Sequence, residues 1–191
     1  MNATAQIRQL ESAVTDSPLL GPVLAAWGEI ALPDVRLVAG AVAQTVWNQA
    51  HDFPPVFGIS DIDLVYFDAA DLSEEAEVRH SRRINALFDG ASTRFDVKNE
   101  ARVHLWYEAK FGYAIPPYRS AEAAIATFPT TATAVGIRPS KGGMDICAPF
   151  GFDDLMRLIV RPNKTQITAA IYRAKVTRWQ ALWPKLTVVG W

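Results

Sequence analysis

The sequence of 191 residues contains a single cysteine, Cys147, and no apolar run of about 18 residues. One cysteine cannot form an internal disulfide, which is typical of proteins in a reducing cytoplasm. The N-terminus lacks the basic-then-apolar pattern of a secretory signal. We therefore expect a cytoplasmic protein that does not cross or anchor to a membrane.

The chain also lacks an excess of charge of either sign. It has 19 Lys and Arg against 20 Asp and Glu, which gives a formal net charge of −1. A dedicated nucleic-acid coat or a protein that binds anionic membranes usually has a strong basic excess. The composition argues against both classes, although a local basic patch would not show in this balance.

Several well-known catalytic signatures are missing. The sequence has no Gly-x-x-x-x-Gly-Lys-Ser/Thr loop, no Gly-x-Gly-x-x-Gly after a strand and no Gly-x-Ser-x-Gly. One cysteine and three histidines give no zinc-site spacing. These absences argue against a P-loop ATPase, a zinc protein and a serine hydrolase of the elbow type.

What remains is an ordinary globular composition, with half of the residues hydrophobic and a fifth charged. We find no repeat, low-complexity tract or linker, so we predict one domain over residues 1–191. Within it we expect a catalytic-type core at about 20–115 and an accessory part of helices and strands at about 116–191.

The most informative segment is a strand pattern that begins at Asp61 and contains Asp63. Successive side chains of a strand point to opposite faces, so Asp61 and Asp63 project together while Ile62 and Leu64 point the other way. Two neighbouring carboxylates repel each other where water is scarce. A divalent cation, Mg²⁺ or Mn²⁺, would offset that repulsion. The alternative is a chance Asp-x-Asp at a solvated strand end.

A third aspartate, Asp96, lies in a later strand pattern between Phe95 and Val97. Whether it shares a face with the first two depends on strand register, which the sequence leaves open. If it does, three carboxylates converge and can hold divalent ions for an in-line phosphoryl transfer. Asp96 would then accept the proton of the attacking hydroxyl.

Two cations near these patterns, Lys98 and Arg102, are candidates for anion binding. Lys98 and Arg102 follow Asp96, and the planar fork of Arg102 suits a phosphate. A solvated face or an ion pair is the alternative for them. Lys175 and Arg178 have the spacing of a solvated helix face.

Hydrophobic periodicity and turn residues predict alternating helices and strands. The main helices are expected at about 4–15, 18–31, 41–50, 73–89, 100–111 and 164–182, and the main strands at about 35–39, 61–67 and 93–98.

The order of a strand, Gly40, a helix, an Asp-x-Asp strand and a later strand aspartate resembles the DNA polymerase beta-type nucleotidyltransferase superfamily. More closely, residues 37–48, 61–68 and 96–107 are similar to a bacterial family of nucleotidyltransferase-like proteins of unknown substrate. The likeness continues through residues 128–136 and 160–163.

This resemblance implies an α/β (α+β) fold, a mixed β-sheet flanked by helices with a helical C-terminal part. It implies that Asp61 and Asp63 bind the metal and that Asp96 is the third carboxylate. It also places the turn at Gly40 and Ala41 against the triphosphate, where backbone N–H groups bind phosphate. The superfamily usually has Ser or Gly where this chain has Ala41, and its gap from the glycine to the paired aspartates is shorter.

We therefore predict a metal-dependent nucleotidyltransferase that moves a nucleoside monophosphate from a nucleoside triphosphate to a hydroxyl and releases pyrophosphate. The acceptor is left open among a small molecule, RNA and protein, as is the oligomeric state. Two alternatives remain: a catalytically degenerate nucleotide-binding or regulatory module, and a partner protein of the toxin–antitoxin type.

Overall fold

A five-stranded mixed sheet forms the centre of the computed structural model, which describes residues 3–91 and 93–191. The strand order is β3-β2-β1-β4-β5. Strands β2 and β3 are parallel, and the other neighbours are antiparallel. This arrangement confirms the predicted fold class. The strands are β1 (Arg36–Val38), β2 (Asp61–Tyr66), β3 (Arg94–Asn99), β4 (Gly136–Ser140) and β5 (Gly143–Cys147).

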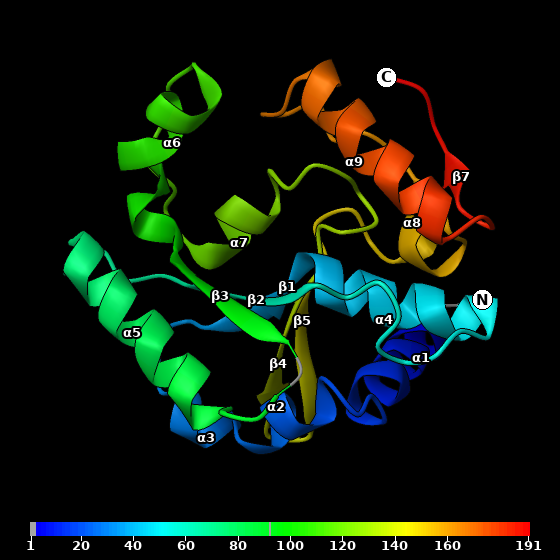
Figure 1. Ribbon diagram of the computed structural model, residues 1–191, viewed down its shortest axis with the longest axis horizontal. Coiled ribbons are helices and arrows are strands. Elements are labelled where there is room, and N and C mark those ends of the chain that lie inside the picture. The colour runs from blue at the N-terminus through cyan, green and yellow to red at the C-terminus, as the bar shows by residue number, and fades with distance from the viewer. Residues whose placement is uncertain (1–2, 92) are drawn as a thin grey trace.

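Helices cover the sheet on both sides, and α6, α7 and α9 lie above it in the view of Figure 1, with α2 and α3 below. The elements outside the sheet are α1 (Ala3–Thr15), α2 (Gly21–Ala25), α3 (Trp27–Ile30), α4 (Ala39–His51), α5 (Glu74–Leu87), the short 3₁₀ helix η1 (Glu100–Arg102), α6 (Val103–Phe111), α7 (Ala121–Ile125), α8 (Asp153–Met156), α9 (Ala169–Leu182) and the strand pair β6 (Ile159–Val160) and β7 (Thr187–Val188).

Two local differences from the predicted elements have physical causes. The helix expected at 18–31 is split into α2 and α3, because the backbone leaves the helical region at Ala26 (φ −89°, ψ 14°). The parallel pair of β6 and β7 has only two residues in each strand, too few for a periodic signal. None of the helices in residues 3–91 and 93–191 is both long and apolar enough to cross a membrane.

The two faces of β2 have different environments. Ile62 and Leu64 are buried in the main hydrophobic core, as alternation along the strand predicts. The opposite face carries Asp61, Asp63 and Val65, and Val65 packs in a small second cluster. The acidic face of β2 is therefore next to an apolar patch, which limits its access to water.

Helix α4 begins two residues earlier than predicted, at Ala39 rather than residue 41. Ala39 has φ +55°, a left-handed conformation that is costly for a residue with a side chain. Its N–H donates to the carbonyl of Val135, which holds the strand-to-helix corner in place. Gly40 is consequently in the first turn of α4, directly beside β2.

A cluster of tryptophan rings fixes α9 against α4. The ring of Trp47 contacts those of Trp179 and Trp183 edge to face, each with a centroid separation of 5.4 Å. Trp47 and Trp183 are fully buried. These contacts place one side of α9 at the acidic face of the sheet.

Polar contacts reinforce that anchor at the end of α9. The indole N–H of Trp183 donates to Asn48 Oδ1 at 2.7 Å. His51 donates from Nδ1 to the carbonyl of Trp47 and accepts the N–H of Lys185 at Nε2. The C-terminal segment is thus tied to α4 by both packing and hydrogen bonds. The division into a core at 20–115 and an accessory part at 116–191 stays a prediction.

The anchor predicts a strong effect of Gly58→Ala. Gly58 has φ +71°, and a Cβ there would lie 2.7 Å from ring atoms of Trp183. Strain and overpacking together should lower the free energy of unfolding by roughly 2–4 kcal/mol, measured by urea denaturation. Gly112→Ala is the matched control, since its φ is +84° but no atom of the described residues lies within 4 Å of a Cβ placed there. It should cost only about 1 kcal/mol, from the left-handed backbone alone, and equal losses in the two variants would contradict the steric role of Trp183.

Candidate functional site

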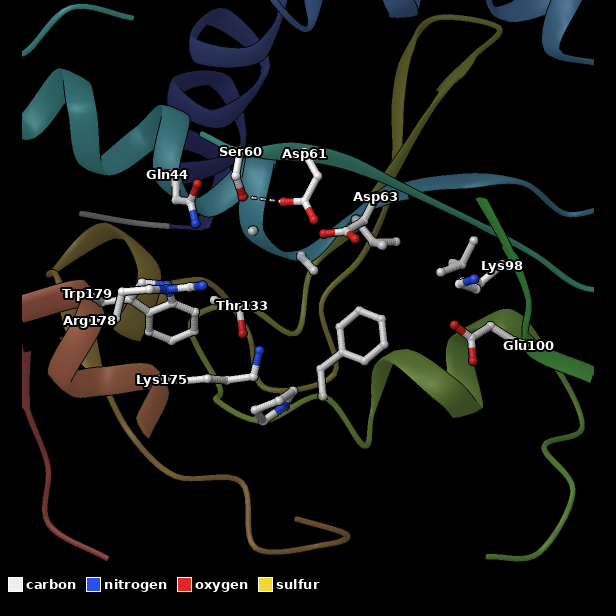
Figure 2. A pocket seen from close by; sticks show the side chains of 16 residues that line it. Gln44, Ser60, Asp61, Asp63, Lys98, Glu100, Thr133, Lys175, Arg178 and Trp179 are labelled. Carbon is white, nitrogen blue, oxygen red and sulfur yellow. Dashed lines mark hydrogen bonds between the residues drawn. The ribbon is translucent and has the colours of Figure 1, made fainter. Parts of the chain in front are cut away.

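A cavity of about 380 Å³ lies between the acidic face of the sheet, the start of α4 and one side of α9. Figure 2 shows the side chains that point into it. The charged ones are Asp61, Asp63, Lys98, Glu100, Lys175 and Arg178.

Asp61 and Asp63 project into the cavity from the same face of β2, as the sequence predicts. Ser60 Oγ donates to Asp61 Oδ1 at 2.7 Å, and the backbone N–H of Gly40 is near enough to Asp63 to lower the pKa of that carboxyl group. A Cβ on Gly40 would lie 3.7 Å from Asp63 Oδ2 and 3.3 Å from the Gln44 amide nitrogen. The start of α4 is therefore in van der Waals range of this carboxylate, and a side chain at Gly40 would crowd the Gln44 amide rather than the carboxylate.

The environment of Asp63 disfavours its charge. Burial, followed by the charges of Asp61 and Asp96, raises the pKa of Asp63 to about 7. The ammonium of Lys175 and the N–H of Gly40 act in the opposite direction. Negative charge at this point is thus only partly offset by the protein.

Asp96 lies beside Asp63, since the parallel register of β2 and β3 pairs these two residues. Paired positions of neighbouring strands share a face, so Asp96 projects on the side of Asp61 and Asp63. Its Oδ1 is 3.4 Å from the ammonium of Lys98, which is also 3.8 Å from Glu77 Oε1. Asp96 is therefore near the pair but engaged by a cation.

The donor set at Asp61 and Asp63 fits a divalent ion. Within residues 3–91 and 93–191, no three acidic, histidine or cysteine side chains lie close enough together to hold a metal by themselves. Mg²⁺, however, is usually bound through one or two carboxylates, with water and substrate phosphates as further ligands. Two aspartates that repel each other beside an open cavity meet that requirement.

The remaining predicted residues are placed differently. Lys98 lines the cavity, whereas the methyl group of Ala41 is buried in the core, so only the backbone of Ala41 can face a ligand. Arg102 lies outside this cavity, where its guanidinium binds Glu77 Oε1 at 3.0 Å and the carbonyl of Leu72. The structure does not bring Arg102 to the paired aspartates.

Sequence reasoning underrated the α9 residues Lys175 and Arg178, which line the cavity with Trp179. The solvated face predicted for Lys175 is wrong. Burial, followed by the charge of Arg178, lowers the pKa of Lys175 from its ordinary value. The indole N–H of Trp179 is buried without an acceptor among the described residues. Arg178 and Trp179 follow Lys175 by three and four positions, a spacing that indicates one shared face of a helix.

Glu100 lines the same cavity on the side of β3 and is almost fully buried. Burial, followed by the charges of Glu77 and Asp63, raises the pKa of Glu100 to about 8, although Lys98 opposes this. Near neutral pH this carboxyl group is mostly protonated.

The comparisons with known proteins agree with this geometry. A nucleotidyltransferase family model matches residues 25–188, and the chain belongs to this family. A comparison with curated proteins finds no match. The chain is similar to a solved NMR structure described as revealing a CCA-adding enzyme head domain, with 24% identity, 96% of each chain covered and a TM-score of 0.79. That likeness shows a shared fold, and the predicted family is confirmed.

Glu100→Gln should change the pH dependence of stability. Because folding raises the pKa of Glu100 from 4.5 to about 8, its stabilising contribution is complete below about pH 4.5 and is lost as pH rises through 8. We would measure the free energy of unfolding by urea denaturation with chelator between about pH 5 and 8. Relative to the variant, the wild type should lose up to about 1.4 kcal/mol of this free energy per pH unit. Exposed Glu108→Gln is the control and should leave the slope unchanged. Parallel curves for wild type and Glu100→Gln would contradict the assigned environment.

Proposed function

We propose that the protein is a metal-dependent nucleotidyltransferase that moves a nucleoside monophosphate from a nucleoside triphosphate to a hydroxyl group and releases pyrophosphate. The observation that carries the proposal is that Asp61 and Asp63 project into a cavity that α9 lines with cations, while the strand register sets Asp96 beside Asp63. Family membership supports nucleotidyl transfer in general.

In this proposal, Asp61 and Asp63 hold Mg²⁺ or Mn²⁺, which neutralises negative charge on the phosphates when bound. The hard carboxylate oxygens and the incomplete offset of charge at Asp63 support this assignment.

The triphosphate would lie between the start of α4 and α9. The N–H groups of the first helical turn have no acceptor within the helix and favour anions. The N–H of Gly40 already favours the charged form of Asp63, so we assign this role to the N–H of Ala41. Lys175 and Arg178 supply positive charge from the opposite wall.

Asp96 would accept the proton of the attacking hydroxyl. The new bond joins the acceptor oxygen to the α-phosphorus, and the bond from that phosphorus to the pyrophosphate oxygen breaks. Lys98 positions Asp96 by the ion pair at 3.4 Å and keeps a cation close to the transferred phosphate.

The same ion pair favours a second candidate, a module that binds nucleotide without turnover. A carboxylate held by Lys98 is less available as a base, and Ala41 lacks the hydroxyl that the superfamily usually has at this position. Binding of a triphosphate without release of pyrophosphate would support this candidate.

Asp61→Asn and Asp63→Asn should remove metal-dependent binding of nucleotide. In wild type, a nucleoside triphosphate with Mg²⁺ or Mn²⁺ should raise the melting temperature by mass action, and chelator should abolish the shift. Both variants should lose it, while Asp52→Asn, an almost fully exposed site with the same charge change, should keep it. Full metal-dependent stabilisation in either site variant would contradict the assignment.

Lys175→Ala and Arg178→Ala should weaken binding of the triphosphate. Each removes a charged partner of a phosphate, a contact of about 1.5–3 kcal/mol, so the dissociation constant should rise roughly 10- to 100-fold. Arg173→Ala is the control on the same helix, because Arg173 is exposed and outside the cavity. Calorimetry with each nucleotide measures these dissociation constants. Equal affinities for all three variants would show that the cations of α9 do not bind the triphosphate.

A further inference from the structure

A second cavity of about 330 Å³ adjoins the first. Its size is at the lower end of the range for small-molecule sites. The two cavities meet at residues that line both of them: Lys98, Glu100, Phe128, Pro129 and Lys175.

Beyond this shared mouth, the walls of the second cavity are mostly aromatic and aliphatic, with Thr127 and Gln166 as polar exceptions. Its hydroxyl groups are already paired: Tyr107 with Tyr113 at 3.1 Å, and Tyr118 with Thr127 and Gln166 at 2.9 and 2.8 Å. A ligand therefore meets mostly ring faces and aliphatic groups. The apolar walls are Val103, Trp106, Tyr107, Phe111, Tyr118 and Ile171.

The second cavity opens on a specific side of the aspartates. Figure 2 shows Asp61 and Asp63 between two groups, with Trp179 and Arg178 on one side and Lys98 and Glu100 on the other. In an in-line displacement the attacking and leaving oxygens lie on opposite sides of the phosphorus. If pyrophosphate leaves toward Arg178, which lines only the first cavity, the acceptor arrives from the side of Lys98.

We propose that the second cavity binds the acceptor, and that the acceptor is a small alcohol with a flat apolar body. This inference rests on the proposed function. The hydroxyl would lie at the shared mouth beside Lys98, whose ammonium is 3.4 Å from Asp96 Oδ1. Its oxygen would join the α-phosphorus, its proton would pass to Asp96, and pyrophosphate would leave.

The chemistry of the walls favours this occupant over two others. A nucleobase would bury several donors and acceptors against walls whose hydroxyls are already paired, which costs free energy. An RNA end would carry phosphates into the cavity, yet its lining beyond the mouth, as far as the structure describes the chain, has no Lys or Arg. An uncharged ring with a hydroxyl arm avoids both costs.

Ile171→Trp tests the proposal by filling the second cavity from α9, because Ile171 lines that cavity and not the first. Ile171→Phe is a smaller change that guards against misfolding. Ala174→Trp is the control, since Ala174 is an exposed residue of the same helix. The probe is 2-naphthaleneethanol, whose binding is measured by saturation-transfer NMR, while binding of Mg²⁺-nucleotide is followed by melting temperature.

We expect saturable binding of the probe to wild type and to Ala174→Trp, and a loss of affinity of about tenfold or more in Ile171→Trp, which corresponds to about 1.4 kcal/mol. Stabilisation by nucleotide should remain in all variants. Probe affinity that is unchanged in both Ile171 variants, or no saturable binding to wild type at about 1 mM, would overturn the proposal. Loss of nucleotide stabilisation in Ile171→Trp with retained probe binding would instead assign the second cavity to the nucleobase.

These readouts distinguish a failure of the proposed function from a failure of the acceptor assignment. If Asp61→Asn retains the metal-dependent nucleotide response, the proposed function fails whatever the probe does. If that response behaves as expected and only the probe fails to bind, the acceptor assignment alone is overturned.

Discussion

Repulsion among the carboxylates of β2 and β3 is the constraint on which the site depends. The parallel register sets Asp96 beside Asp63, and alternation along β2 adds Asp61 to the same face. Burial strengthens the repulsion, since less water is present to screen it. The chain offsets part of it with the N–H of Gly40 and with the cations Lys98 and Lys175. The repulsion that remains favours the binding of a divalent ion that also carries a phosphate ligand.

The position of α9 follows from packing far from the aspartates. The tryptophan rings of α4 and α9, together with the bond from Trp183 to Asn48, hold the helix against the sheet. That anchor brings Lys175 and Arg178 into the cavity, although both are more than 100 positions from Asp61 in the sequence. The wall that would bind phosphate is thus a product of tertiary structure, and changes at the aromatic anchor should alter the site from a distance.

Local patterns in the sequence predict a large share of the fold. Alternation identifies β2 with its two faces, and periodicity places α5 within the helix expected at about 73–89, because each signal involves neighbouring residues. The pairing of Asp63 with Asp96 could not be predicted, because register depends on contacts between distant segments. The partner of Arg102 was missed for the same reason: Glu77 reaches it only once α5 packs beside β3. Lys175 was misjudged because its burial depends on how α9 lies on the rest of the chain.

The most direct test of a metal-dependent site is to locate the metal. Crystals grown with Mn²⁺ and a non-hydrolysable nucleoside triphosphate can be measured at the manganese absorption edge. The account predicts an anomalous peak bound by Asp61 and Asp63, with the triphosphate extending toward Lys175 and Arg178. A nucleotide bound elsewhere in the molecule, or manganese with no contact to either aspartate, would contradict it.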